Sequence, residues 1–70
     1  MKIHTKHRVY EVDHANKRIR LFSGPERPYA RHLTKDWEPY NYIWYEEGCP
    51  MHVTVGFSIV STSTVKLVEP

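Results

Sequence analysis

Residues 8–23 constrain the fold more than any other segment, because their apolar and charged side chains match in only one hairpin register. With a four-residue loop at residues 14–17, apolar residues face each other on one side and acids face arginines on the other. Such cross-strand pairs stabilise a hairpin by about 0.2–1 kcal/mol each, and a slip of one residue would exchange the two faces. The segment therefore predicts an antiparallel hairpin with the pairs Val9–Phe22, Tyr10–Leu21, Glu11–Arg20, Val12–Ile19 and Asp13–Arg18.

The C-terminal third carries a second strand pattern. Residues 52–60 alternate between apolar residues and small or polar ones, and this period of two predicts one half-buried strand. A turn at residues 61–63 would then lead into a last strand at residues 64–68. The inward side chains of the longer strand are predicted to be Val53, Val55, Phe57 and Ile59.

Residues 40–47 fit two structures. Their aromatic content favours a strand, whereas Pro39 before them and Gly48 after them are typical of the start and end of a helix. We favour the strand, and a helix at residues 39–47 is the alternative. Before this segment, proline and glycine residues interrupt residues 24–39, which predicts a long surface loop.

These patterns predict a single mainly β domain over residues 1–70, built as a small antiparallel barrel or twisted meander of about five strands. A helix at residues 39–47 would instead give an α+β fold with the helix packed on the sheet. A chain of this length can bury only one thin core. The side chains expected in that core are Ile3, Tyr10, Val12, Ile19, Leu21, Leu33, Ile43, Trp44, Val53, Val55, Phe57, Ile59, Val65 and Leu67.

Residues able to bind metal or to catalyse a reaction form only weak patterns. His4, His7, Cys49 and His52 together offer one thiolate and three imidazoles, the number that tetrahedral zinc requires, but their spacing matches no familiar zinc motif. Cys49 follows two glutamates, whose negative charge disfavours the thiolate that a nucleophile needs. We therefore expect no metal site, no cofactor and no enzyme activity.

The cellular setting is inferred from three features. The single cysteine excludes an intrachain disulfide framework. The first eight residues are polar and basic, unlike a secretory leader, and no apolar run approaches the roughly 20 residues that span a bilayer. We expect a soluble cytoplasmic protein that does not bind membranes.

Charge is distributed unevenly along the chain. Residues 1–35 contain nine of the ten Lys and Arg residues against three acids, whereas residues 36–70 contain one Lys against five acids. A basic half can bind nucleic acid through its phosphates, although the predicted hairpin pairs two of the arginines with acids. Nucleic-acid binding by a small β barrel is therefore the alternative function, and its predicted contacts are Arg8, Arg20, Arg27 and Arg31.

Aromatic residues are concentrated between Tyr29 and Tyr45, where both tryptophans and four of the five tyrosines occur. Trp, Tyr and Arg dominate the energetics of protein interfaces, and a thin core cannot cover all of these side chains. We expect a non-enzymatic protein that covers a site on a protein partner, and the composition also allows a homo-oligomer. The size would suit a phage or mobile-element inhibitor or adaptor. The predicted partner-binding residues are Tyr29, Arg31, Trp37, Tyr40 and Tyr42.

Overall fold

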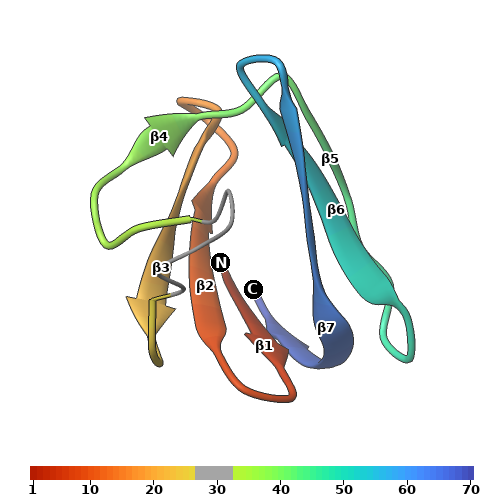
Figure 1. The fold of residues 1–70 in the computed structure, drawn as a ribbon. Coiled ribbons are helices and arrows are strands. Elements are labelled where there is room, and N and C mark those ends of the chain that lie inside the picture. The colour runs from red at the N-terminus through yellow and green to blue at the C-terminus, as the bar shows by residue number, and fades with distance from the viewer. Residues whose placement is uncertain (27–32) are drawn as a thin grey trace.

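The structure, a computed structural model, describes residues 1–26 and 33–70. Regular structure in these residues consists of the strands β1 (Lys2–Thr5), β2 (Val9–Asp13), β3 (Arg18–Ser23), β4 (Glu38–Pro39), β5 (Tyr42–Trp44), β6 (Pro50–Val55) and β7 (Ser58–Glu69). They form one antiparallel sheet in the order β4-β3-β2-β1-β7-β6-β5, which curls into a half-barrel (Figure 1). The mainly β prediction is confirmed, and the alternative helix at residues 39–47 is wrong. Nowhere in the described ranges is there a helix long and apolar enough to cross a membrane.

The hairpin formed by β2 and β3 has the predicted loop and register. Only its open end differs, because a bulge between Val9 and Tyr10 places Val9 opposite Ser23 instead of Phe22. The alternation of burial along both strands follows the predicted apolar face. The four pairs next to the loop are those expected from the sequence: Tyr10–Leu21, Glu11–Arg20, Val12–Ile19 and Asp13–Arg18.

The single strand predicted at residues 52–60 is wrong, because a two-residue turn at Gly56 and Phe57 divides it. Val55 at the end of β6 pairs with Ser58 at the start of β7. Gly56 has a φ of 61°, and a type II′ hairpin turn places glycine with positive φ at this first central position. Paired residues share a face of the sheet. The inward residues therefore have odd numbers in β6 before the turn and even numbers at the start of β7 after it.

This turn changes which residues fill the core. Phe57 and Ile59 are exposed against the prediction, and Val60 is buried in their place. Trp44 and Leu67, also predicted in the core, are exposed as well. The buried apolar residues of the described chain are Ile3, Tyr10, Val12, Ile19, Leu21, Leu33, Tyr40, Met51, Val53, Val55, Val60 and Val65.

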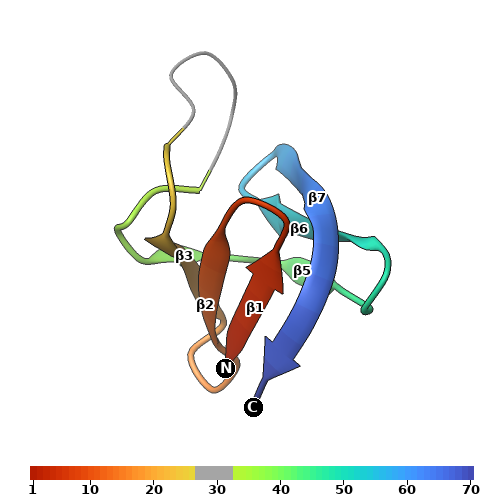
Figure 2. The same ribbon diagram turned by 90° about the horizontal axis from the view of Figure 1, so that it is seen from below.

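Strand β7 continues through the turn predicted at residues 61–63 and connects the two halves of the sheet. Its first part pairs with β6 and its last part with β1, and Figure 2 shows it curving between them. The pairing with β6 is irregular between Pro50 and His52. There the backbone N–H of Met51 donates to Thr62 Oγ1 at 3.1 Å, so a side chain replaces a regular ladder bond where the strand changes neighbours.

The two edge strands, β4 and β5, are joined by Tyr40 and Asn41. The N–H of Tyr40 donates to the carbonyl of Lys17 at 3.0 Å, and the N–H of Asn41 donates to the carbonyl of Thr54 at 2.8 Å. The Tyr40 side chain is buried, with its hydroxyl 3.2 Å from His14 Nδ1. This corner therefore ties the N-terminal strands to the C-terminal strands across the open side of the half-barrel.

The segment predicted as a long surface loop, residues 24–39, is partly ordered against the sheet. It contains the short strand β4, whose Glu38 pairs with Ile19. The side chain of Leu33 is buried, as predicted. The carbonyl of Thr34 accepts a hydrogen bond from the N–H of Leu21 at 2.7 Å, so the segment returns to β3 before it reaches the corner.

Candidate functional site

The partner-binding residues predicted from the sequence do not gather on one surface of the described structure. Tyr29 and Arg31 lie outside the described residues. Tyr40 is in the core, and burial is the main cause that raises the pKa of its hydroxyl. Trp37 is half-buried against side chains of β3, and of the described residues in this set only Tyr42, on β5, is exposed.

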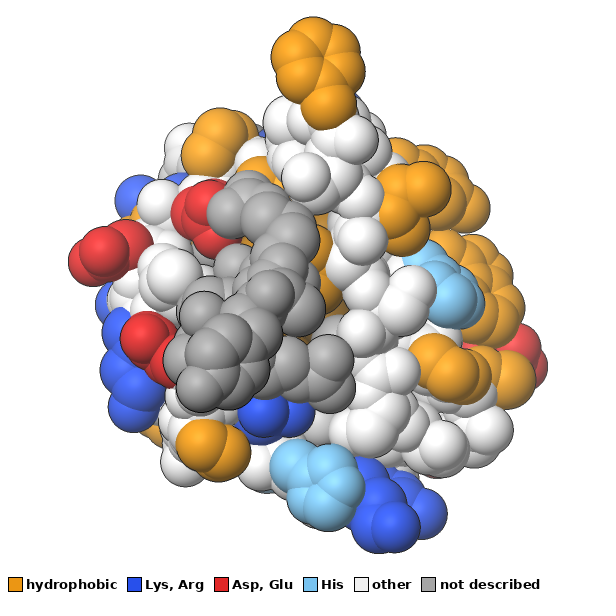
Figure 3. Space-filling view, in the orientation of Figure 1, with side chains coloured by type: hydrophobic (Ala, Val, Ile, Leu, Met, Phe, Trp, Pro, Cys, Tyr) orange, Lys and Arg blue, Asp and Glu red, His pale blue; other side chains and the backbone are white. Residues whose placement is uncertain are grey.

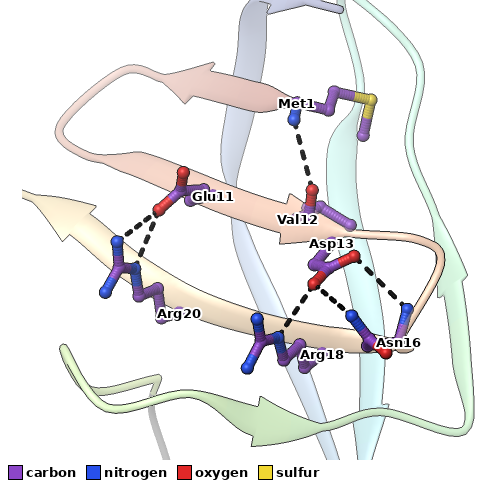
Figure 4. Close-up of polar contacts among 7 residues, drawn as sticks. All are labelled: Met1, Glu11, Val12, Asp13, Asn16, Arg18 and Arg20. Atoms are coloured by element: carbon purple, nitrogen blue, oxygen red, sulfur yellow. Dashed lines mark hydrogen bonds and ion pairs between the residues drawn. The ribbon is translucent and has the colours of Figure 1, made fainter.

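The outer face of β2 and β3 carries charged side chains that are paired within the chain (Figure 4). Arg20 Nε donates to Glu11 Oε1 at 2.8 Å, and Arg18 Nε donates to Asp13 Oδ2 at 2.9 Å. The indole ring of Trp37 covers both arginines, with its centroid 4.5 Å from Arg18 Cζ and 4.4 Å from Arg20 Cζ. We refer to these five residues as the charged face. Their ionic groups and the indole ring contact one another within the chain.

Asp13 anchors one end of the charged face at the β2–β3 loop. Asn16 donates to it twice, from Nδ2 to Oδ2 at 2.9 Å and from the backbone N–H to Oδ1 at 3.3 Å. Hydrogen bonds from Asn16, followed by that from Arg18, lower the pKa of Asp13 to about 2. The carboxylate therefore stays ionised well into acid, and it holds the loop and the arginine together.

The two arginines of the alternative nucleic-acid site that are described, Arg8 and Arg20, both make contacts within the chain, and Arg20 makes an ion pair. Arg20 is paired with Glu11. Arg8 Nε donates to the carbonyl of Pro25 at 2.7 Å. Arg27 and Arg31 lie outside the described residues. A phosphate would have to compete with these internal contacts at Arg8 and Arg20.

The outer face of β5, β6 and β7 has the opposite character. Its large apolar side chains are exposed: Tyr42 by 60%, Trp44 by 39%, Ile59 by 72% and Phe57 completely. Figure 3 shows hydrophobic side chains gathered on the side of the molecule where Figure 1 places β5 and β6. We call this surface the aromatic face. The strand register arranges it in two rows across the strands, with Phe57 at the hairpin tip. The first row is Tyr42, Thr54 and Ile59, and the second is Trp44, His52 and Ser61.

The second row of the aromatic face is ordered by side-chain contacts. The His52 ring stacks against Trp44, with centroids 5.9 Å apart and an interplanar angle of 26°. His52 Nδ1 also lies 2.8 Å from Ser61 Oγ, within hydrogen-bond distance. Side chains already held in one conformation lose less entropy when a partner binds, so this row is preorganised for contact.

Phe57 occupies an unusual position for a large apolar side chain. Two-residue turns are normally built from glycine and small polar residues, yet here the residue after Gly56 is an aromatic one. Phe57 is completely exposed, so it contributes little to the core of its own chain. Its place at the hairpin tip, next to the row that contains Ile59, makes it a projecting end of the aromatic face.

The large apolar residues of the aromatic face other than Tyr42 were assigned to the core from the sequence; they are Trp44, Phe57 and Ile59. A usable signal was present, because glycine at the first of two residues between apolar runs is the pattern of a type II′ hairpin turn. That turn would have directed Phe57 and Ile59 outward. Tyr42 was predicted as a partner-binding residue from its aromatic neighbourhood alone.

The histidines and the cysteine considered as zinc ligands have other surroundings. His4 contacts the Glu69 carboxylate across β1 and β7, and His52 is engaged with Ser61. Cys49 is a free, half-buried thiol in the loop between β5 and β6. Within residues 1–26 and 33–70, no three His, Cys, Asp or Glu side chains are arranged to hold a metal ion.

The described surface therefore offers two outer faces with different chemistry. The charged face satisfies its own ionic groups, whereas the aromatic face presents rings, an aliphatic side chain and three hydroxyls without any Lys, Arg, Asp or Glu. Such a set can supply apolar contact, stacking and a few hydrogen bonds, which are the elements of binding. No protein-family model, no curated protein and no solved structure matches this chain.

Proposed function

We propose that this chain is a small non-enzymatic binding protein that covers a site on a protein partner with its aromatic face. One observation carries the proposal: Tyr42, Trp44, Phe57 and Ile59 are exposed on one continuous surface of three strands. Contiguous exposed apolar surface marks interaction sites in soluble proteins. Trp and Tyr are also enriched among the residues that contribute most to binding.

The charges around the aromatic face favour a protein over a nucleic acid as the partner. Proteins that stack single-stranded bases combine aromatic side chains with a positive groove that follows the phosphates. The aromatic face contains no Lys or Arg, and the exposed Glu46 and Glu47 follow β5 at one end of it. Arg8 and Arg20 belong to the other half of the sheet, where they are engaged.

The experiment is capture of partners from the organism that encodes the chain, with variants that separate the aromatic face from the rest of the surface. Phe57→Ser removes the projecting ring without touching the core. Leu67→Ser is the matched control, because Leu67 is an exposed apolar residue on β7 outside the aromatic face. We expect Phe57→Ser to reduce capture of a specific protein by at least about tenfold, as for an interface hot spot, and Leu67→Ser to leave it unchanged.

Thermal unfolding of both variants establishes that they fold. Nuclease treatment and a salt series accompany the capture, because nucleic-acid affinity falls steeply with salt. Capture that nuclease abolishes, or that is insensitive to Phe57→Ser, would contradict the proposed function.

A further inference from the structure

The half-barrel has two edge strands that differ in their protection against pairing with another strand. β4 consists of Glu38 and Pro39, a charged residue and a residue without a backbone N–H, and both discourage strand addition. β5 consists of Tyr42, Ile43 and Trp44, with neither charge nor proline. β5 is the last strand on its side of the sheet, so no described strand pairs with its outer edge.

We propose that β5 pairs antiparallel with β5 of a second copy of this chain, so that two half-barrels join into one continuous sheet. A two-fold interface uses the same patch twice, so that patch must be complementary to itself. With the two-fold axis at Ile43, Tyr42 of each copy lies opposite Trp44 of the other. Aromatic residues opposite each other are a favourable cross-strand combination, and the Tyr-Ile-Trp sequence of β5 provides two of them.

Charge is compatible with this pairing. The strand itself is uncharged, and the nearest acid after it is Glu46. In the proposed register, Glu46 lies level with Tyr40 of the other copy. The two Glu46 residues are then about 20 Å apart along the strands, at about 3.4 Å per residue, which exceeds the screening length of about 8 Å in physiological salt. No like charges meet across the pair.

The pairing stands independently of the proposed function but would serve it. Three strands at a spacing of about 4.8 Å make a strip only about 15 Å wide, which is narrow beside a standard interface that buries about 800 Å² on each partner. Antiparallel neighbours in one sheet keep corresponding side chains on the same face. A dimer through β5 therefore presents both aromatic faces side by side on a strip about 30 Å wide.

The test is sedimentation equilibrium of the full chain from micromolar to millimolar concentration, with two double variants of β5. In Tyr42→Lys with Trp44→Lys, each lysine faces a lysine across the proposed pair. In Tyr42→Lys with Trp44→Glu, each lysine faces a glutamate. Both variants lose the same aromatic rings. At about 0.15 M salt the repulsion from the higher net charge of the Lys/Lys variant is screened beyond about 8 Å, so a difference between the variants reports the register. We expect the wild type to dimerise, and the Lys/Lys variant to dissociate at least about tenfold more readily than the Lys/Glu variant.

A wild type that stays monomeric at millimolar concentration would overturn the pairing. Equal dissociation of the two double variants would overturn it too, because the residues would not face each other in this register. Ile59→Ser is expected to leave the dimer intact, whereas loss of the dimer would indicate contact between aromatic faces. Partner capture that requires Phe57 in a strictly monomeric protein would leave the proposed function standing and refute only the pairing.

Discussion

The charged face and the aromatic face lie on the outer side of the same curled sheet, yet they are completed in different ways. On β2 and β3, two arginines find carboxylates and an indole within the chain. On β5 to β7, large apolar side chains remain in water. The comparison separates residues that the fold uses from residues that it leaves available. Aromatic content alone does not make this distinction, because Trp37 and Trp44 fall on opposite sides of it.

The largest changes in stability are expected from mutations in the core, which the N-terminal and C-terminal strands share. Ile3 in β1 and Met51 in β6 are both completely buried in one core. Truncation of either to alanine should cost about 2–5 kcal/mol, a large part of the total for a domain of this size, which is about 4–10 kcal/mol. Urea denaturation measures both changes. If only one of the two variants lost much stability, the N-terminal and C-terminal strands would be stabilised separately.

A smaller effect tests the difference between the outer faces directly. Trp37→Ala should lower the free energy of unfolding by about 1–2 kcal/mol, because the ring covers two arginines and an exposed cation–π contact contributes about 0.5–1 kcal/mol. Trp44→Ala removes the stack with His52 but no cation–π contact among the described residues, and should cost less. The measurement is chemical denaturation of both variants. Were Trp44→Ala the more destabilising change, the aromatic face would be a structural element and the proposed function would lose its support.

The smallest expected effect is a change in stability at acidic pH that depends on Asp13 of the charged face. The pKa of Asp13 is about 2, below its ordinary value of 3.8. The ionised carboxylate therefore stabilises the fold fully above pH 3.8, and this contribution is lost as the pH falls toward about 2. We expect Asp13→Asn to be less stable than the wild type at neutral pH and the difference to shrink in acid. Denaturation curves across this range check it; a difference independent of pH would remove Asp13 as the cause.

The β2–β3 hairpin was predictable in detail because two independent patterns agreed on it. The apolar pairs and the opposite charges select the same register, and a slip would have violated both. The class of fold followed from the same local signals. The course of β7 was not predictable in this way, because Thr62 and Ser63 look like turn residues but lie within a strand that exchanges one neighbour for another.

The aromatic face was only partly predictable, and the reason is the Gly56–Phe57 turn. A two-residue turn leaves the alternation of residue types unbroken while it exchanges the faces, so Phe57 and Ile59 fit a buried pattern that the structure does not have. The exposed position of Tyr42 followed from composition, but the burial of Tyr40 depends on the corner contacts with Lys17 and His14. Those contacts join distant parts of the chain, and local periodicity carries no information about them.

The pairing of β1 with β7 has a consequence for how the chain reaches this structure. The ladder brings His4 against Glu69, which is 65 residues away in the sequence, whereas the β2–β3 hairpin closes over a four-residue loop. Non-local contacts slow folding, because chain entropy is lost before such contacts can form. We expect the hairpins to form first and the β1–β7 ladder to close last. Changes in that ladder should then accelerate unfolding and leave the folding rate almost unaltered.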